Sequence, residues 1–162
     1  MRLFKSALLA GSLLAVNICA AGAFAATQDI VDTAKAAGNF TTLVKALQIS
    51  GLDKTLKGKG PYTVFAPNDA AFAKLPAEDL NALLADKKKL PAVLKYHVLK
   101  NDLPVKEIKK LDLAPTMQGY DLSIHKNGDK VLVDSGEIIK ADIKCSNGEI
   151  QEIDTVLMPK DW

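Results

Sequence analysis

The sequence predicts an α+β domain, and a change in the spacing of its apolar residues is the main reason. Between Phe40 and Leu47 apolar residues stand at i, i+3, i+4 and i+7, the spacing of one buried helix face. From Leu122 onward apolar and polar residues alternate instead, as they do in half-buried strands. Helices gathered early in a chain and antiparallel strands gathered late are typical of an α+β domain.

Residues 1–25 have the pattern of a signal peptide. Arg2 and Lys5 precede an apolar run over residues 7–16, and Ala23-Phe24-Ala25 forms an A-x-A cleavage site. The apolar run is shorter than the ~20 residues that cross a bilayer. Cleavage after Ala25 predicts an exported protein, periplasmic or extracellular, with a single domain over residues 26–162.

Removal of this segment changes both the charge and the cysteine count. The chain carries 21 Lys and Arg against 19 Asp and Glu, and the loss of Arg2 and Lys5 leaves 19 of each. A near-neutral chain gives no reason to expect a nucleic-acid partner, which needs a basic surface. With Cys19 removed, Cys145 stands alone, so no disulfide forms within the mature chain. Lipoprotein processing at Cys19 is the alternative, and the bulky Ile18 disfavours it.

Three short helices are expected at the start of the mature chain. Asp29 suits the N-cap of a first helix, which Gly38 ends. Asn39 is expected to cap the second helix, which Ser50-Gly51 breaks. Residues 52–56 then form a further short helical piece.

The most sharply specified stretch is a strand-to-helix junction over residues 62–72. Its apolar run ends at Pro67, which cannot donate to a sheet and which biases Ala66 away from the helical region. Asn68 suits the N-cap of the following helix, and Asp69 places negative charge where the helix dipole favours it.

Two more helices and a set of hairpins follow the junction. Apolar residues at helical spacing predict helices over residues 76–84 and 90–97. Asn127-Gly128 and Asn147-Gly148 are expected to form the turns of two hairpins, because this dipeptide adopts the tight turns that join antiparallel strands.

The sequence contains few of the residues and none of the common motifs that indicate catalysis. The mature chain has two histidines and one cysteine, and it lacks the H-E-x-x-H, C-x-x-C and G-x-S-x-G motifs. We therefore expect no enzyme activity, no cofactor and no metal site. Hydrolysis by Cys145 with His97 or His125 as base is the catalytic alternative, although nothing in the sequence places these side chains together.

His97 has two interpretations. It shares an apolar helix face with Leu90, Val93 and Leu94, and it follows Tyr96 directly. On the first interpretation His97 is a buried, neutral histidine that is hydrogen-bonded to a backbone group or a carboxylate. On the second, Tyr96 and His97 form or support a surface that binds a partner.

Three ordered motifs resemble those of the fasciclin-type (FAS1) domain family, and the resemblance covers residues 29–159. Tyr96-His97 is similar to the family's central tyrosine-histidine motif, and the stretch from Asn147-Gly148 through Asp154 to Pro159 is similar to its second signature. The segment TVFAPNDAAF is similar to the first signature, and its distinguishing positions here are Thr63, Phe65, Pro67, Asn68, Asp69 and Phe72.

The resemblance implies a wedge of mainly antiparallel β-strands with several short α-helices packed at one side. It also implies a role in adhesion or interaction at the cell surface or in the matrix, without catalysis. In animal members an aspartate-isoleucine pair and the tyrosine-histidine region contribute to integrin-mediated adhesion. Asp142-Ile143 and Tyr96-His97 occupy these positions and are therefore the candidate interaction residues. Ala141 and Lys144 differ from the neighbouring proline and methionine of that motif, so integrin recognition is not implied.

The residues themselves favour a structural role for the two signatures. Phe65, Phe72, Ile150 and Val156 are large apolar groups, for which core packing is the usual role. The sequence thus predicts an exported, non-catalytic domain whose partner is a protein or a cell-surface or matrix component. A small-ligand or polysaccharide-binding envelope protein is the alternative.

Overall fold

The computed structural model describes residues 27–160, and the predicted signal peptide over residues 1–25 lies outside this part of the chain. The helices of the described part are α1 (Ile30–Ala37), α2 (Thr41–Ser50), α3 (Leu52–Leu56), α4 (Asp69–Ala73), α5 (Ala77–Ala85), α6 (Lys89–Tyr96) and α7 (Val105–Ile108). Its strands are β1 (Tyr62–Pro67), β2 (Val98–Leu99), β3 (Leu113–Pro115), β4 (Asp121–Asn127), β5 (Lys130–Val133), β6 (Gly136–Cys145) and β7 (Gly148–Ile153). The predicted α+β class is confirmed.

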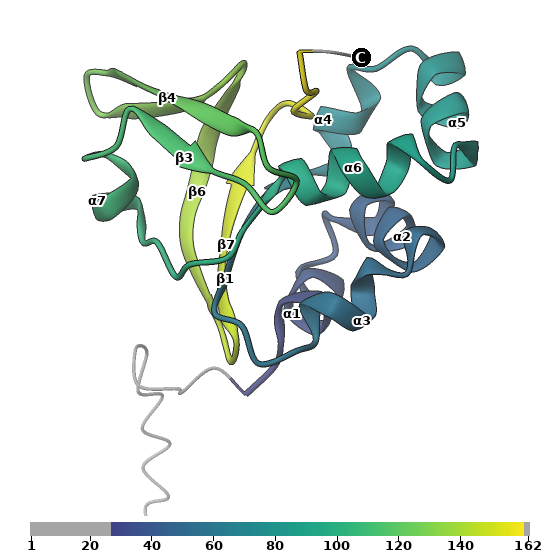
Figure 1. Ribbon diagram of the computed structural model, residues 1–162, viewed down its shortest axis with the longest axis horizontal. Helices are drawn as coiled ribbons and strands as arrows, with labels where there is room; N and C mark the ends of the chain where they lie inside the picture. The colour runs from purple at the N-terminus through teal and green to yellow at the C-terminus, as the bar shows by residue number, and fades with distance from the viewer. Residues whose placement is uncertain (1–26, 161–162) are drawn as a thin grey trace, which may run out of the picture.

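The strands form one sheet in the order β2-β1-β7-β6-β5-β4-β3. Every neighbouring pair is antiparallel except β1 and β7, which run parallel. The sheet curls far enough for its two edges to meet, because Met117 N–H, just after β3, donates to the Val98 carbonyl of β2 over 2.7 Å. Figure 1 shows α1–α6 gathered on one side of this sheet and α7 on the other.

Two apolar cores lie on the two faces of β1. Val64 and Ala66 point into a core shared with the helices, whereas Phe65 points into a second core inside the curled sheet. Because successive residues of a strand face opposite sides, a strand buried on both faces reads as an unbroken apolar run. This explains the apolar sequence of β1, and the expected core positions Phe65, Phe72, Ile150 and Val156 are all buried.

The junction after β1 ties three distant segments together. Asn68 caps α4 by accepting from Ala71 N–H at 2.8 Å, as the sequence predicts. The amide of Asn68 also donates to Glu152 Oε1 on β7 at 3.0 Å. Asp69 accepts from the backbone N–H of Thr42 at 2.8 Å and so caps the start of α2.

The prediction that Asn39 caps α2 is wrong. The N-cap residue of α2 is Phe40, which makes no side-chain cap, and Asp69 supplies the carboxylate instead. Asn39 donates its amide to Glu152 Oε1 at 2.9 Å. A carboxylate brought from 27 residues away competes better for these amides than a neighbouring amide oxygen, because its charge strengthens the hydrogen bonds.

The structure adds short elements that the sequence pattern did not predict, namely β2, β3 and α7. Each has four residues or fewer, which is too short for a periodic pattern to show. The first expected hairpin turn joins β4 to β5 but is shifted by one residue, since Gly128 and Asp129 form it and Asn127 is the last residue of β4. The second turn is shifted by one residue, since Ser146 and Asn147 form it and Gly148 begins β7.

Candidate functional site

The Tyr96–His97 pair lies at the C-terminal end of α6, and both residues are only 2% exposed. His97 Nδ1 lies 2.7 Å from the carbonyl oxygen of Val93, and Leu157 N–H donates to His97 Nε2 over 2.9 Å. A carbonyl oxygen can only accept, so these contacts place the ring proton on Nδ1 and leave Nε2 as the acceptor. The imidazole therefore joins α6 to the C-terminal segment.

Burial fixes the protonation state of both side chains. Burial lowers the pKa of His97 to about 4, against the opposing effects of its bond to Val93 and the charge of Asp134. The Tyr96 hydroxyl donates to Asp134 Oδ2 at 2.6 Å. Burial, together with this bond to a carboxylate, raises the pKa of Tyr96, so its hydroxyl stays protonated. His97 thus has the buried, neutral state of the first interpretation.

Asp142 and Ile143 lie where β6 bulges. The pairing of β6 with β7 shifts register between Lys140 and Ile143, and Asp142 has a φ of +56°. Asp142 Oδ1 accepts from the backbone N–H of Val105 at 2.8 Å and from Gln151 Nε2 at 2.9 Å. Ile143 is half-buried against the helix-facing core. The aspartate therefore holds the start of α7 against β6, and only part of either side chain reaches the surface.

All but the first two residues of β6 form a strand edge. β5 pairs with β6 only at Gly136 and Glu137, so residues 138–145 have β7 as their only strand neighbour in the described part of the chain. Ile139 on this stretch is 49% exposed. We call residues 138–145 the β6 edge. Its Lys144 forms an ion pair with the buried Glu149 of β7.

The two pairs of candidate interaction residues are not brought together by direct bonding. Among residues 27–160, no hydrogen bond joins Tyr96 or His97 to Asp142 or Ile143. The tyrosine-histidine pair is buried and bonds to the C-terminal segment through His97, whereas the aspartate-isoleucine pair lies on the β6 edge.

The remaining signature residues make internal contacts. The fully buried Thr63 hydroxyl donates to the Asn101 carbonyl at 2.6 Å and accepts from Leu103 N–H at 2.9 Å. Pro67 ends β1 opposite Ile153 of β7. Such contacts hold the loop after β2 and the parallel strand pair in place.

The polar residues of the second signature also make their hydrogen bonds inside the fold. The Asn147 amide donates to the carbonyls of Leu56 and Gly58, and its oxygen accepts from Ile30 N–H at 3.1 Å. Gly148 has no room for a side chain, because a Cβ would collide with the Tyr62 carbonyl. Asp154 Oδ1 accepts from Glu137 N–H at 2.9 Å and thereby fixes the start of β6.

Among the described residues, no hydrogen bond joins the candidate nucleophile to either of its candidate bases. Cys145 is half-buried, and burial raises the pKa of its thiol. Its sulfur lies 3.6 Å from the Ile143 carbonyl, and in the part of the chain that the structure describes no hydrogen bond links it to His97 or to the exposed His125. The same residues contain no group of three or more His, Cys, Asp or Glu that could hold a metal ion.

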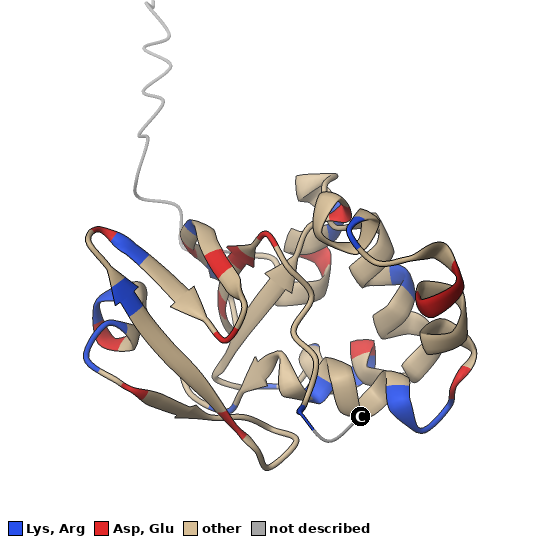
Figure 2. Cartoon of the chain, turned by 90° about the horizontal axis from the view of Figure 1, so that it is seen from above, with Lys and Arg blue, Asp and Glu red and all other residues tan. Residues whose placement is uncertain are grey.

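Charged side chains are mixed over the surface. Figure 2 shows Lys and Asp or Glu residues interspersed along helices, strands and turns. The ion pairs that form are mostly between exposed side chains, as in Lys110 with Glu107. An arrangement of this kind differs from the basic stripe that nucleic-acid binding needs.

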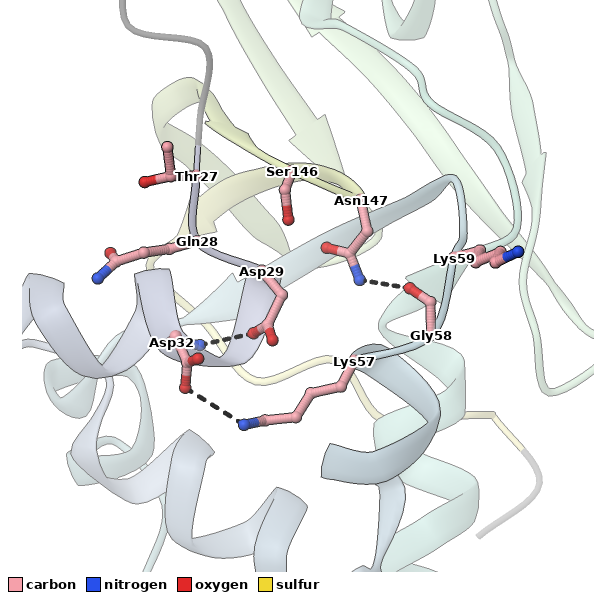
Figure 3. A pocket seen from close by; sticks show the side chains of 9 residues that line it. All are labelled: Thr27, Gln28, Asp29, Asp32, Lys57, Gly58, Lys59, Ser146 and Asn147. Atoms are coloured by element: carbon pink, nitrogen blue, oxygen red, sulfur yellow. Dashed lines mark hydrogen bonds and ion pairs between the residues drawn. The ribbon is translucent and has the colours of Figure 1, made fainter.

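Several hollows on the described surface are places where a ligand could bind. One of them, of about 610 Å³, lies between the start of α1, the α3–β1 loop and the β6–β7 turn, and Figure 3 shows it. Two smaller ones, of about 340 and 280 Å³, share Met158 in their lining. Met158 lies within the stretch that resembles the second signature, but the sequence did not indicate it as a binding residue, because a lone methionine follows no periodic pattern.

A curled seven-stranded sheet that is flanked by helices and held by its own motif residues defines this α+β domain. The fasciclin domain family model matches residues 38–159. The chain therefore belongs to the fasciclin (FAS1) domain family, as its motifs suggest.

Curated relatives share more than a third of their aligned residues with this chain. It is 37% identical over 132 residues to protein sll1483 of Synechocystis, which covers 80% of this chain and 73% of that protein. It is 38% identical over 130 residues to transforming growth factor-beta-induced protein ig-h3 of Sus scrofa, where it spans only 19% of that protein. The cell surface glycolipoprotein MPB83 of Mycobacterium bovis is 39% identical over 105 residues, which are 65% of this chain and 46% of that protein.

The fold also matches a solved structure. The FAS1 domain pair of the insect cell adhesion molecule fasciclin I superimposes with a TM-score of 0.69, over 84% of this chain and 52% of that chain. Sequence identity is 15%, so this likeness concerns the fold alone. Among the described residues, no helix has both the length and the apolar character needed to cross a membrane.

Proposed function

We propose that this chain is an exported, non-catalytic FAS1 domain that mediates adhesion or protein interaction at the cell surface, in the periplasm or in the matrix. The observation that carries the proposal is the contrast between the motif residues and the β6 edge. The polar motif residues make internal contacts, whereas the β6 edge pairs with β7 on one side only and carries the exposed Ile139. Strand edges are ready-made templates for pairing with another chain.

Export and location follow from the N-terminal pattern. The cleavable signal peptide over residues 1–25 is part of the proposal, and it would deliver a mature domain that starts near Ala26. The mycobacterial relative is a cell surface glycolipoprotein, and this similarity supports a location outside the cytoplasm.

The candidate interaction residues take different parts in this proposal. Asp142 sets the direction of the β6 edge through its bonds to Val105 and Gln151, and Ile143 anchors the edge to the core. Tyr96 and His97 support the surface without reaching a partner themselves, because both are almost fully buried.

A photo-crosslinking experiment tests the proposal. Ile139 is replaced by the photo-reactive residue p-benzoyl-phenylalanine in the native host, and Leu113 on the edge strand β3, which is 55% exposed, receives the same replacement as a matched control. We expect a reproducible crosslinked protein from position 139 and a much weaker band from position 113. The absence of any crosslink at position 139, or equal bands at both positions, would count against the proposal.

Saccharide binding is the second candidate function, and the polar hollow of Figure 3 favours it. Asp29 and Asp32 offer acceptors, while Lys57 and Ser146 offer donors, and Asn147 locks the three segments that carry them. Sugar hydroxyls can pair with both kinds of group at once. We expect N-acetylglucosamine to shift the backbone amide signals of Gln28 and Ser146 in an NMR titration if this function is correct, and unchanged signals would rule out this sugar.

A further inference from the structure

Two of the hollows share Met158 in their lining and therefore adjoin each other at this residue. The first hollow lies against α5 and α6, where Leu83 and Val93 contribute apolar lining. The second lies against β4 and the β5–β6 turn, where its lining includes Ser123 and Asp134. Met158 lines both hollows, so its side chain, which is 40% exposed, lies between them. We call the combined depression the Met158 groove.

The buried tyrosine-histidine pair holds the walls of this groove. His97 bonds to the Val93 carbonyl on one side and to Leu157 N–H, the neighbour of Met158, on the other. Tyr96 bonds to Asp134, which lines the far end. Because these bonds are buried and satisfied, the groove is formed before any ligand arrives, which reduces the entropy cost of binding.

The first hollow is apolar at its floor and acidic at its rim. Leu83 and Val93, which are 7% and 3% exposed, line this hollow. Asp79 and Asp86 stand at the rim with a single lysine, Lys89. Backbone hydrogen bonds from Lys89 and Lys88 lower the pKa of Asp86, so its carboxylate stays ionised in mild acid. A matching occupant therefore carries a large apolar group next to a positive charge.

An extended chain that crosses Met158 could contact both hollows at once. A compact ligand would fill one hollow of about 340 or 280 Å³, whereas an extended peptide would continue over Met158 from one to the other. A methionine suits such a position, because its flexible thioether adapts to different side chains laid on it.

We propose that the Met158 groove binds an extended peptide segment of a partner protein, with one large apolar side chain of the peptide over Met158 and an adjacent Lys or Arg facing Asp79. The proposal rests on the proposed function as a protein-interaction domain, and it names the surface and the chemistry of the partner. It uses a surface other than the β6 edge, so the two can be tested apart.

Methionine methyl NMR tests the proposal directly. The protein is labelled with ¹³C at the methionine methyl groups and titrated with a short synthetic peptide that has a central leucine between two lysines. We expect a saturable shift of the Met158 signal and a constant Met117 signal, since Met117 lies next to β2, packs against the helix-facing core and lines neither hollow. Replacement of the central leucine by alanine should weaken binding about tenfold or more, because most of the buried apolar area is lost.

Charge variants sharpen the test. Asp79→Lys should weaken binding of the lysine peptide several-fold, whereas Asp129→Lys, an exposed aspartate of the β4–β5 turn, is the matched control and should leave it unchanged. The proposal is overturned if the Met158 signal does not move, if a peptide with glutamates in place of the lysines binds equally well, or if Asp129→Lys has the same effect as Asp79→Lys. A shift of Met158 with decanoate but not with the peptide would make the groove a lipid site and would also overturn it.

The outcome is separable from that of the proposed function. Met158→Lys should abolish peptide binding while far-UV circular dichroism and the crosslink from position 139 are retained. If the peptide fails to bind and the crosslink persists, the groove proposal falls and the proposed function stands. If the peptide binds and position 139 gives no crosslink, the groove stands and the β6 edge is not the contact surface.

Discussion

Lowering the pH from 7 to 4 should destabilise this protein through His97. An unfolded histidine has a pKa of about 6.5, whereas burial lowers the pKa of His97 in the folded protein to about 4. Between these values the unfolded chain binds a proton that the folded chain does not bind. The free energy of unfolding therefore falls as the pH falls through this window.

The size of the effect follows from the two pKa values. A difference of about 2.5 in pKa corresponds to roughly 3 kcal/mol of the free energy of unfolding, lost at about 1.4 kcal/mol per pH unit between pH 6.5 and 4. Asp69 and Asp154 also have lowered pKa values in the folded protein. Their stabilising contributions are present above the unfolded value and are lost only below about pH 4, outside the window in which His97 acts.

Urea denaturation followed by circular dichroism at a series of pH values measures this slope. His97→Gln should be less stable at pH 7 but should lose most of the slope between pH 6 and 4.5, because no titrating group remains at that position. His125→Gln is the matched control, since His125 is exposed, and it should keep the wild-type slope. Equal slopes in the wild type and in His97→Gln would refute the argument from burial.

Two substitutions test contacts that hold the fold, and a labelling reaction tests the burial of Cys145. Asn147→Ala should lower the free energy of unfolding by about 2–3 kcal/mol in urea denaturation, since it removes three buried or partly buried hydrogen bonds, while Asn127→Ala at the other hairpin should change it by less than about 1 kcal/mol. Asn68→Ala should lower the melting temperature because it loses a helix cap and a bond to Glu152, together about 2 kcal/mol, and Asn68→Ser should recover part of this by restoring the cap. The thiol of Cys145 should react with Ellman's reagent at pH 8 more slowly in the native protein than in urea, because burial covers it and raises its pKa, and equal rates would contradict this.

Much of the local structure could be predicted because local chemistry decides it. The cap at Asn68, the strand end at Pro67 and the stop at Gly38 each depend on a residue and its immediate neighbours, and the structure has all three. The family could be identified because its signatures keep such residues, among them Pro67 and Asn68, in a recognisable order along the chain.

The prediction for Asn39 shows where local reasoning ends. Asn39 is a good capping residue next to a helix start, yet Asp69 arrives through the tertiary fold and takes that role. Glu152 then holds the amides of both Asn39 and Asn68, a contact that joins residues 84 and 113 positions apart. No periodicity or dipeptide signal can report a partner at that separation.

The sequence by itself determined the class of the fold, the order of its main helices and strands, and the motif residues, because apolar spacing and capping chemistry act over a few residues. Only the tertiary structure decided which motif residues are exposed. Folding buries Tyr96 and His97 under the C-terminal segment, turns Asp142 into a clamp on α7, and leaves Met158 and Ile139 at the surface. Exposure depends on how distant elements pack over a residue, and that information is carried by the three-dimensional arrangement of the whole chain.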